Sequence, residues 1–464
     1  MKRPMAAPVA PEIFKAYDIR GIVDRTLTEE AAESIGRGLA TMGKAKGVKT
    51  FVVGRDGRLS GPRLAAALAR GLNAGGMDVI DVGVVATPMV YFATFEYGTG
   101  SGVMVTGSHN PPEYNGLKMV VAGDTLAAEA IQDLRRLIES GEFSTGKGKV
   151  ESRDISGAYL DRIAGDVKLS RLMRVAIDCG NGSPGAFAPA LFKRLGCEVQ
   201  ELFTEVDGTF PNHHPDPSKP ENLQDLIAAV KAGHAEVGLA FDGDGDRLGV
   251  VTRSGKIVYP DRQLMLFAAD VLQRNPGAQV IFDVKCTRKL FGWIRDHGGE
   301  PLLWKTGHSL VKAKLKETGA PLAGEMSGHV FFKERWYGFD DGLYAGARLL
   351  EILSKAPDPT QALEDLPDSV STPELNLALP KEGENHALIA RVAKSATFEG
   401  AREVITLDGL RVEYEDGFGL MRASNTTPVV VLRFEADTDE ALARIQADFR
   451  RVLLADNPGA KLPF

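Results

Sequence analysis

Short apolar runs alternate with amphipathic helical stretches in the first part of the chain. Residues 51–53 and 102–105 are continuous apolar runs, residues 79–82 are apolar except for Asp81, and a helical pattern covers 60–75. Another helix is expected near Met89. Strands that alternate with helices of this length are typical of α/β structure.

The α/β pattern continues for two further units before the composition changes. A second unit starts with the expected strand at 174–178, and a third starts near Ile257. After a segment with several prolines, the rest of the chain reads as four strands and one final helix, which indicates an α+β module. We therefore predict four domains, at residues 1–153, 154–256, 257–368 and 369–464.

Composition narrows the classes of protein that this chain can be. At 464 residues, with roughly 150 per domain, it is long enough for roughly three or four domains. The 55 basic and 62 acidic residues give a net charge of −7 with no basic block, which argues against nucleic acid or an anionic membrane as partner. No 18-residue apolar run or secretory leader occurs, and three scattered cysteines suggest reduced thiols. We expect a cytoplasmic protein.

A polar turn follows the apolar run 102–105 and carries the first candidate for chemistry. It reads Val-Thr-Gly-Ser-His-Asn-Pro-Pro over 105–112, with Ser108 at its centre. Loops at strand ends of α/β sheets are open to ligands, although the same residues also form ordinary solvated turns. Thr106 and Asn110 stand where a serine hydrolase would have glycines, so that class is excluded.

An acidic loop follows the apolar run 237–241. Asp242, Asp244 and Asp246 alternate with glycines, whose backbone freedom lets all three carboxylates turn inward. Oxygen ligands without a nearby Cys or His pair favour Mg²⁺ or a similar ion. An EF-hand is excluded because its positions six and twelve hold Arg247 and Arg253. A solvated acidic turn is the alternative.

A third motif indicates a different function. Residues 180–185 match G-x-G-x-x-G between a strand and a helix, and Glu201 stands near the spacing of a ribose ligand. No residue further along suggests hydride transfer. We therefore interpret the motif as a tight structural turn and keep dinucleotide binding as the alternative.

Four motifs together resemble those of the phosphomannomutase/phosphoglucomutase branch of the α-D-phosphohexomutase superfamily. In chain order they are Thr-Gly-Ser-His-Asn-Pro (106–111), Asp-Gly-Asp-Gly-Asp-Arg (242–247), Gly-Glu-Met-Ser-Gly-His (324–329) and Arg-Ala-Ser-Asn-Thr-Thr-Pro (422–428). The resemblance spans more than 300 residues. It implies three related α/β domains with mixed sheets and a smaller α+β C-terminal domain, arranged around a central active-site cleft.

The resemblance also implies roles for individual residues. The expected catalytic residues are Ser108 as a phosphoserine, His109, Lys118, Arg247 and His308. The expected ligands of Mg²⁺ are Asp242, Asp244, Asp246 and the phosphate on Ser108. Substrate contacts are expected from Tyr17, Arg20, Lys285, Glu325, Ser327, His329, Arg422, Ser424, Asn425, Thr426 and Thr427.

The implied reaction interconverts hexose 1-phosphates and hexose 6-phosphates of mannose and glucose. It passes through a hexose 1,6-bisphosphate, which also serves as activator, and the enzyme is expected to act as a monomer. Phosphoglucosamine mutase-like specificity and a metal-dependent sugar phosphatase remain alternatives. A separate C-terminal phosphate loop argues against the phosphatase, which would have no use for it.

Overall fold

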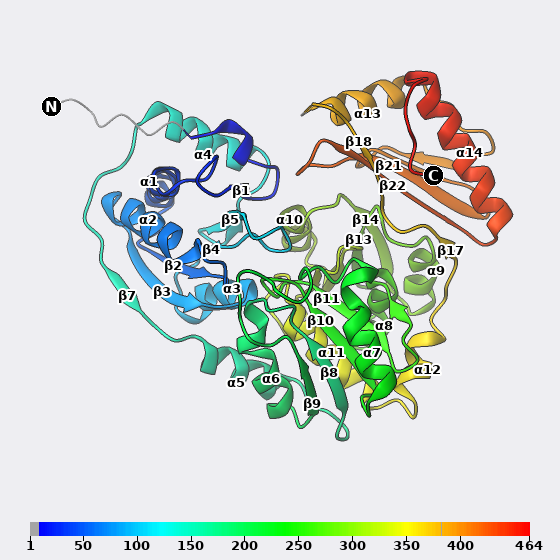
Figure 1. The fold of residues 1–464 in the computed structure, drawn as a ribbon, viewed down its shortest axis with the longest axis horizontal. Helices are drawn as coiled ribbons and strands as arrows, with labels where there is room; N and C mark the ends of the chain where they lie inside the picture. Colours follow the sequence, from blue (N-terminus) through cyan, green and yellow to red (C-terminus); the bar gives the residue numbers. More distant parts are fainter. Residues whose placement is uncertain (1–8, 382) are drawn as a thin grey trace.

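The computed structural model describes residues 9–381 and 383–464, which form four lobes (Figure 1). The first two lie on the left and at the bottom of the view, the third lies beside the second, and the fourth lies at the upper right. Each lobe contains one sheet. Within the described residues, no helix is both long and apolar enough to cross a bilayer.

The first lobe has a mixed sheet with strand order β1-β5-β4-β2-β3-β7, and β6 pairs with β5. Alternation along β2 places Phe51 and Val53 in one core and Val52 in another, because successive side chains face opposite sides. The elements are η1 (Pro11–Ile13), β1 (Ile19–Ile22), α1 (Glu29–Ala45), β2 (Thr50–Arg55), α2 (Gly61–Ala74), β3 (Asp78–Val84), α3 (Thr87–Glu96), β4 (Gly102–Val105), β5 (Tyr114–Val121), β6 (Asp124–Thr125), α4 (Glu129–Ser140) and β7 (Val150–Ser152).

The second and third lobes repeat this arrangement on a smaller scale. Their strand orders are β12-β11-β10-β8-β9 and β14-β13-β15-β16. The second lobe contains α5 (Ser156–Asp166), β8 (Arg174–Asp178), η2 (Ser183–Ala186), α6 (Ala188–Arg194), β9 (Glu198–Leu202), η3 (Pro220–Leu223), α7 (Gln224–Ala232), β10 (Val237–Phe241), β11 (Leu248–Thr252) and β12 (Ile257–Val258). The third contains α8 (Pro260–Arg274), β13 (Gln279–Asp283), α9 (Lys289–Asp296), β14 (Glu300–Trp304), α10 (His308–Thr318), β15 (Leu322–Gly324), β16 (Val330–Phe332), α11 (Gly342–Leu353) and α12 (Pro359–Glu364).

The fourth lobe is an antiparallel sheet covered by two helices. Its order is β17-β22-β21-β20-β19, and β18 also pairs with β22. The elements are β17 (Val370–Ser371), β18 (Leu375–Ala378), α13 (Glu384–Ser395), β19 (Glu403–Ile405), β20 (Leu410–Glu413), β21 (Gly417–Ala423), β22 (Val429–Ala436) and α14 (Asp439–Asp456). Three mixed α/β units and a different C-terminal unit confirm the predicted fold class.

The hydrophobic core divides the chain unequally. One cluster of buried side chains runs through the first three lobes, whereas the fourth has a core of its own. Among the described residues, one small cluster of Val284, Phe418 and Leu420 joins the buried apolar side chains of the third and fourth lobes. The predicted domain limits stay a proposal; β12, at residues 257–258, belongs to the sheet of the second lobe, just beyond the limit predicted at 256.

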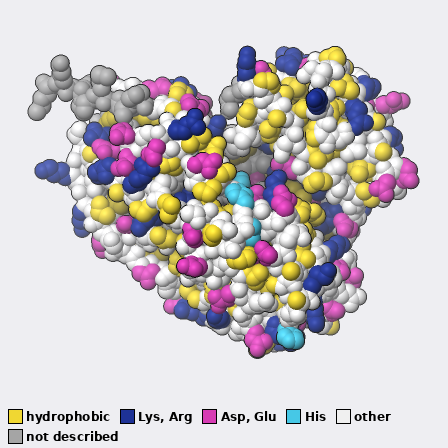
Figure 2. Space-filling view, viewed as in Figure 1, with side chains coloured by type: hydrophobic (Ala, Val, Ile, Leu, Met, Phe, Trp, Pro, Cys, Tyr) yellow, Lys and Arg dark blue, Asp and Glu magenta, His cyan; other side chains and the backbone are white. Residues whose placement is uncertain are grey.

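The same structural device places all four sequence motifs. Each lies between two neighbouring antiparallel strands, β4 and β5, β10 and β11, β15 and β16, or β21 and β22. The chain reverses direction between the two strands of each pair, and the motif lies at this reversal. Figure 2 shows that the molecule is hollowed between its two upper lobes, with acidic, basic and histidine side chains below the notch.

Candidate active site

Ser108 is buried at the tip of the loop between β4 and β5. Its φ of +50° lies in the left-handed region that residues other than glycine rarely adopt. The Ser108 Oγ donates a hydrogen bond to Asp242 Oδ2 at 3.1 Å and lies 3.2 Å from His109 Nδ1. Burial, followed by the charge of Arg247, lowers the pKa of His109 well below its usual value. A backbone held in this conformation beside a carboxylate is typical of functional sites.

The acidic loop lies directly on the serine loop. Asp242, Asp244 and Asp246 are fully buried, and one oxygen of each lies within 4.8 Å of the others. A Cβ at Gly243 would lie 2.5 Å from the Ser108 carbonyl oxygen, so this contact requires glycine. Burial and the charges of Asp246 and Asp244 raise the pKa of Asp242 well above its usual value.

This donor set fits a divalent cation. Asp244 Oδ1 is buried without a hydrogen-bond partner among the described residues, although its other oxygen accepts from Thr87 and Lys118. Three buried carboxylates that repel one another, one of them with a free oxygen, suit a hard ion with oxygen ligands.

Two cations lie against the acidic loop. Lys118 on β5 donates to Asp244 at 2.8 Å and also to Asp246. Burial opposes its charge, but these two carboxylates outweigh that cost and raise its pKa, so Lys118 is protonated. Arg247 Nε lies 3.8 Å from Asp242 Oδ2 and 3.3 Å from His329 Nε2.

The third loop meets the acidic loop through His329. The His329 Nε2 lies 3.2 Å from Asp246 Oδ1, while its Nδ1 lies 3.0 Å from Glu325 and 2.9 Å from the Ser327 hydroxyl. Burial opposes protonation of His329, but Asp246 and then Glu325 outweigh it and raise the pKa to about 9. The predicted sugar-binding residues and one predicted metal ligand are therefore in direct contact.

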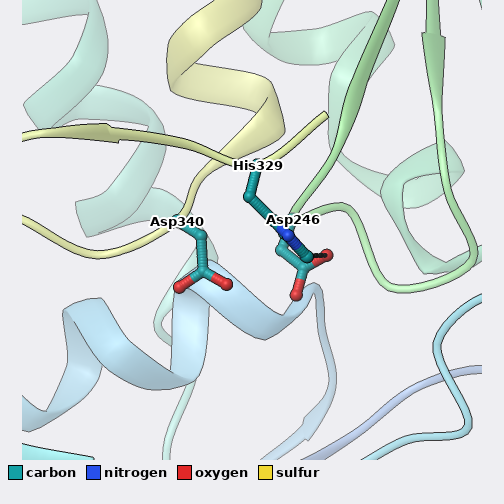
Figure 3. Close-up of side chains that lie close together, drawn as sticks. All are labelled: Asp246, His329 and Asp340. Atoms are coloured by element: carbon teal, nitrogen blue, oxygen red, sulfur yellow. Dashed lines mark ion pairs between the residues drawn. The ribbon is translucent and has the colours of Figure 1, made fainter. Parts of the chain in front are cut away.

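A second polar cluster includes residues that no sequence motif indicated. Asp246, His329 and Asp340 lie together, with the ion pair between the first two marked (Figure 3). Asp340 accepts from Lys312 at 2.7 Å, and its Oδ2 lies 3.7 Å from His308 Nδ1. Burial, followed by the charge of Lys312, lowers the pKa of His308 well below its usual value, so the ring is neutral.

The fourth motif begins at the end of β21 and continues through the turn that leads to β22. Arg422 donates to Asp408 at 3.0 Å, and Ser424 Oγ accepts from the amides of Thr426 and Thr427 at 3.3 Å. Asn425 donates to Tyr17. Among the residues described, no hydrogen bond or ion pair joins this turn to Ser108.

Tyr17 connects three lobes. The Tyr17 hydroxyl donates to the carbonyl of Thr306 at 2.6 Å and accepts from Arg422 at 3.4 Å as well as from Asn425. Burial raises the pKa of this hydroxyl to about 12, so it remains protonated. Nearby, Arg20 donates to the Asn110 side chain at 2.5 Å and therefore lies beside the serine loop.

Lys285 lies at the border of the third and fourth lobes. It follows β13 and donates to Glu374 at 3.0 Å. The charge of Lys285 lowers the pKa of Glu374 to about 2, so this carboxylate is ionised. Glu374, like Asp340 and Lys312, carries no motif signal and was missed by sequence reasoning.

The glycines at 180–185 have a structural explanation. A Cβ at Gly182 would lie 2.8 Å from Gly243, and the amide of Ser183 donates to the Gly243 carbonyl at 2.9 Å. Glu201 pairs with Lys193 at the surface. The turn therefore supports the acidic loop, and nothing in its geometry requires a nucleotide.

Comparison with known proteins places the chain among relatives with the same four units. Models of phosphoglucomutase/phosphomannomutase domains match in order: alpha/beta/alpha domain I at residues 11–145, domain II at 157–255, domain III at 259–370 and the C-terminal domain at 374–452. A phosphoglucomutase of Neisseria gonorrhoeae is 64% identical over 449 residues, covering 96% of this chain and 98% of that one. A phosphomannomutase/phosphoglucomutase of Pseudomonas aeruginosa is 56% identical over 460 residues, covering 99% of each.

A solved structure agrees with the family models and with the two relatives. The crystal structure of a phosphoglucomutase/phosphomannomutase family protein from Burkholderia thailandensis superimposes with a TM-score of 0.94 at 61% identity, covering 98% of this chain and all of that one. Fold, domain order and sequence thus agree over nearly the whole length. The chain belongs to the phosphoglucomutase/phosphomannomutase family.

Proposed function

We propose that this chain interconverts the 1-phosphates and 6-phosphates of glucose and mannose, through a phosphoserine at Ser108 and a hexose 1,6-bisphosphate that also serves as activator. Family membership makes it a phosphotransferase of the mutase type that acts on phosphosugars. One observation carries the proposal. Ser108 Oγ lies 3.1 Å from Asp242, which belongs to the acidic loop, and Asp246 of the same loop contacts His329 of the sugar loop.

In the first transfer, a sugar hydroxyl attacks the phosphoryl group on Ser108. The bond from phosphorus to Ser108 Oγ breaks, a bond to the sugar oxygen forms, and the hydroxyl proton passes to neutral His308. Lys118 and Arg247, both cationic, stabilise charge on the moving group together with His109, which lies beside Ser108. Mg²⁺ held by the three aspartates and the phosphoserine would supply further charge neutralisation. The intermediate then turns and returns its other phosphate to Ser108.

The remaining residues hold the substrate while this happens. Sugar hydroxyls form hydrogen bonds with three residues of the third loop, Glu325, Ser327 and His329. A guanidinium binds phosphate oxygens in pairs, so Arg422 anchors the phosphate that is not reacting. The turn beyond it completes the phosphate site with Ser424, Asn425, Thr426 and Thr427, and the other substrate contacts come from Tyr17, Arg20 and Lys285.

The proposal extends to the organisation of the protein. The protein comprises four domains, at residues 1–153, 154–256, 257–368 and 369–464, and each domain contributes one loop to the site. The enzyme acts as a monomer in the cytoplasm, without a nucleic-acid or membrane partner. The net charge of −7 and the presence of all four loops in one chain support this.

A coupled assay tests the proposed reaction. Glucose 1-phosphate, mannose 1-phosphate and glucosamine 1-phosphate are each supplied with Mg²⁺ and glucose 1,6-bisphosphate, and product is measured together with inorganic phosphate. We expect the 6-phosphates of glucose and mannose, with no accumulation of inorganic phosphate. Release of inorganic phosphate alone would instead identify a phosphatase, and a preference for glucosamine 1-phosphate would identify the other mutase specificity.

Arg422→Ala is expected to raise KM and let more bisphosphate escape during turnover. The anchor for the distal phosphate is lost, while Ser108 and the acidic loop are unchanged. The fourth lobe has its own core, so we also expect it to move toward the others when substrate binds. Released bisphosphate and small-angle scattering with and without glucose 1-phosphate measure the two effects. Unchanged escape and an unchanged radius of gyration would contradict the proposed anchor and the proposed movement.

A further inference from the structure

Asp56 and Arg58 lie in a short segment after β2, the strand beside β4 in the first sheet. The Arg58 side chain is completely buried, with 0% exposure. A buried guanidinium has five N–H groups that need acceptors, and an unpaired one is costly. The acceptors that Arg58 finds are therefore informative.

Arg58 directs four of its five N–H groups at the backbone of the serine loop. Its Nη2 donates to the carbonyls of Ser108 at 2.8 Å and Asn110 at 2.6 Å, and its Nη1 donates to those of Pro111 at 2.6 Å and Tyr114 at 3.0 Å. The fifth, on Nε, bonds Asp56 Oδ2 at 3.2 Å. One side chain thus holds the loop from Ser108 to the start of β5.

Asp56 holds the other side of the loop, and we call Asp56 and Arg58 together the clamp. Its carboxylate accepts from the Thr106 hydroxyl at 2.7 Å and from the Gly107 amide at 3.2 Å. The Thr106 hydroxyl in turn accepts from the amide of Ser108 at 2.7 Å. A Cβ at Gly107 would lie 2.5 Å from the Arg58 guanidinium, so the close packing of loop and clamp requires glycine.

The clamp also contacts the second lobe, which carries the acidic loop. The Phe210 ring lies 5.1 Å from the Arg58 guanidinium carbon, a cation–π distance. A Cβ at Gly208 would lie 2.5 Å from the carbonyl oxygen of Gly57, between the two clamp residues. The position of the serine loop is thereby tied to the lobe that holds Asp242.

We propose that Arg58 and Asp56 are positioning residues that fix the Ser108 loop while Ser108 alternates between hydroxyl and phosphoserine. The proposal rests on the proposed role of Ser108 as phosphoryl carrier. Ser108 stands at a φ of +50°, which its own preference does not favour, and phosphorylation adds about −1.5 to −2 charges to it. Hydrogen bonds to five backbone positions hold this conformation through both transfers, without contact with the sugar.

Arg58→Met removes the five donors and keeps an apolar side chain of similar length. We expect kcat to fall about 100-fold, the scale on which a misplacement of about 1 Å slows an enzyme. The rate at which glucose 1,6-bisphosphate phosphorylates Ser108 should fall in parallel. KM for glucose 1-phosphate should change less than about threefold, because Glu325, Ser327 and His329, which are proposed to bind the sugar hydroxyls, lie on the loop between β15 and β16. Hydrogen exchange should rise over residues 107–114 alone.

Further variants separate positioning from general stability. Arg58→Lys keeps the charge but not the planar array of donors, so it should recover little of the lost kcat. Thr106→Val is a milder change that removes the hydroxyl between Asp56 and Ser108; it should lower kcat with KM unchanged. Arg63→Met is the matched control, because Arg63 is partly exposed on the neighbouring α2 and pairs with Asp24; it should behave as wild type.

The outcomes distinguish this inference from the proposed function. Wild-type protein that accepts no phosphate at Ser108, shown by peptide mass spectrometry, would refute the proposed function itself. Normal loading of the wild type together with wild-type loading and kcat in Arg58→Met would overturn the positioning role alone. If Arg58→Met does not fold, Thr106→Val decides: lowered kcat with unchanged KM supports the proposal, and unchanged kcat overturns it.

Discussion

Ser108→Ala is expected to lower kcat by at least about 10⁴-fold, the scale seen when a catalytic nucleophile is removed. The variant has no oxygen to carry the phosphoryl group between the two positions of the sugar. The acidic loop, Lys118 and the sugar loop stay in place, so binding of glucose 1-phosphate should persist. The coupled assay measures kcat, and isothermal titration measures binding.

Covalent phosphate provides a second readout for the same variant. Treatment with glucose 1,6-bisphosphate should add one phosphate to the wild type, located at Ser108 by peptide mapping, and none to Ser108→Ala. Ser34→Ala is a suitable control, since Ser34 is also buried in the first lobe but lies on α1. Phosphate incorporation and turnover in Ser108→Ala at wild-type levels would assign the nucleophile to another residue.

Local patterns in the sequence were sufficient to predict elements that are continuous apolar runs or amphipathic helices. The apolar run at 102–105 coincides with β4, and the helical pattern at 60–75 matches α2, which begins at Gly61 and ends at Ala74. Helix α8 was not predicted because it buries polar residues, including Asp261, Arg262 and Gln263, which obscure its apolar stripe. Strand β7 was not predicted either, since all three of its residues are exposed and form no apolar run.

The candidate site shows the same division between local and distant information. Each motif is a contiguous loop whose composition indicates its chemistry, so Ser108 and the three aspartates could be predicted. Arg58 bonds the backbone of Ser108, 50 residues away, and Asp340 lies beside Asp246, 94 residues away, and no local pattern encodes such pairs. For Asp56 and Arg58 a signal did exist, because charged residues around a glycine at the end of a strand are candidates by the same rule that selected Ser108.

Asp242→Asn is expected to reduce kcat by about 10³-fold with little loss of structure. Asparagine has the shape of aspartate but lacks the charge, so the loop should bind a divalent cation more weakly and neutralise less charge on the phosphoryl group. Asp244→Asn should have the same effect. Circular dichroism should show wild-type secondary structure, and Asp225→Asn, an exposed change of equal charge on α7 of the same lobe, should retain full activity.

The melting temperature offers a test of the cation that does not depend on activity. Without metal, burial and the neighbouring carboxylates disfavour the ionised form of Asp242, so Asp242→Asn should melt at or above the temperature of the metal-free wild type. A ligand at 100 times its Kd stabilises a folded protein by about 2.7 kcal/mol, so Mg²⁺ should raise the melting temperature of the wild type and of Asp225→Asn. The same Mg²⁺ concentration should shift Asp242→Asn much less, and EDTA should abolish both the shift and turnover in the wild type. An equal Mg²⁺ shift in wild type and Asp242→Asn would show that the ion binds elsewhere, and equal loss of folding and activity in the variant would assign Asp242 a structural role.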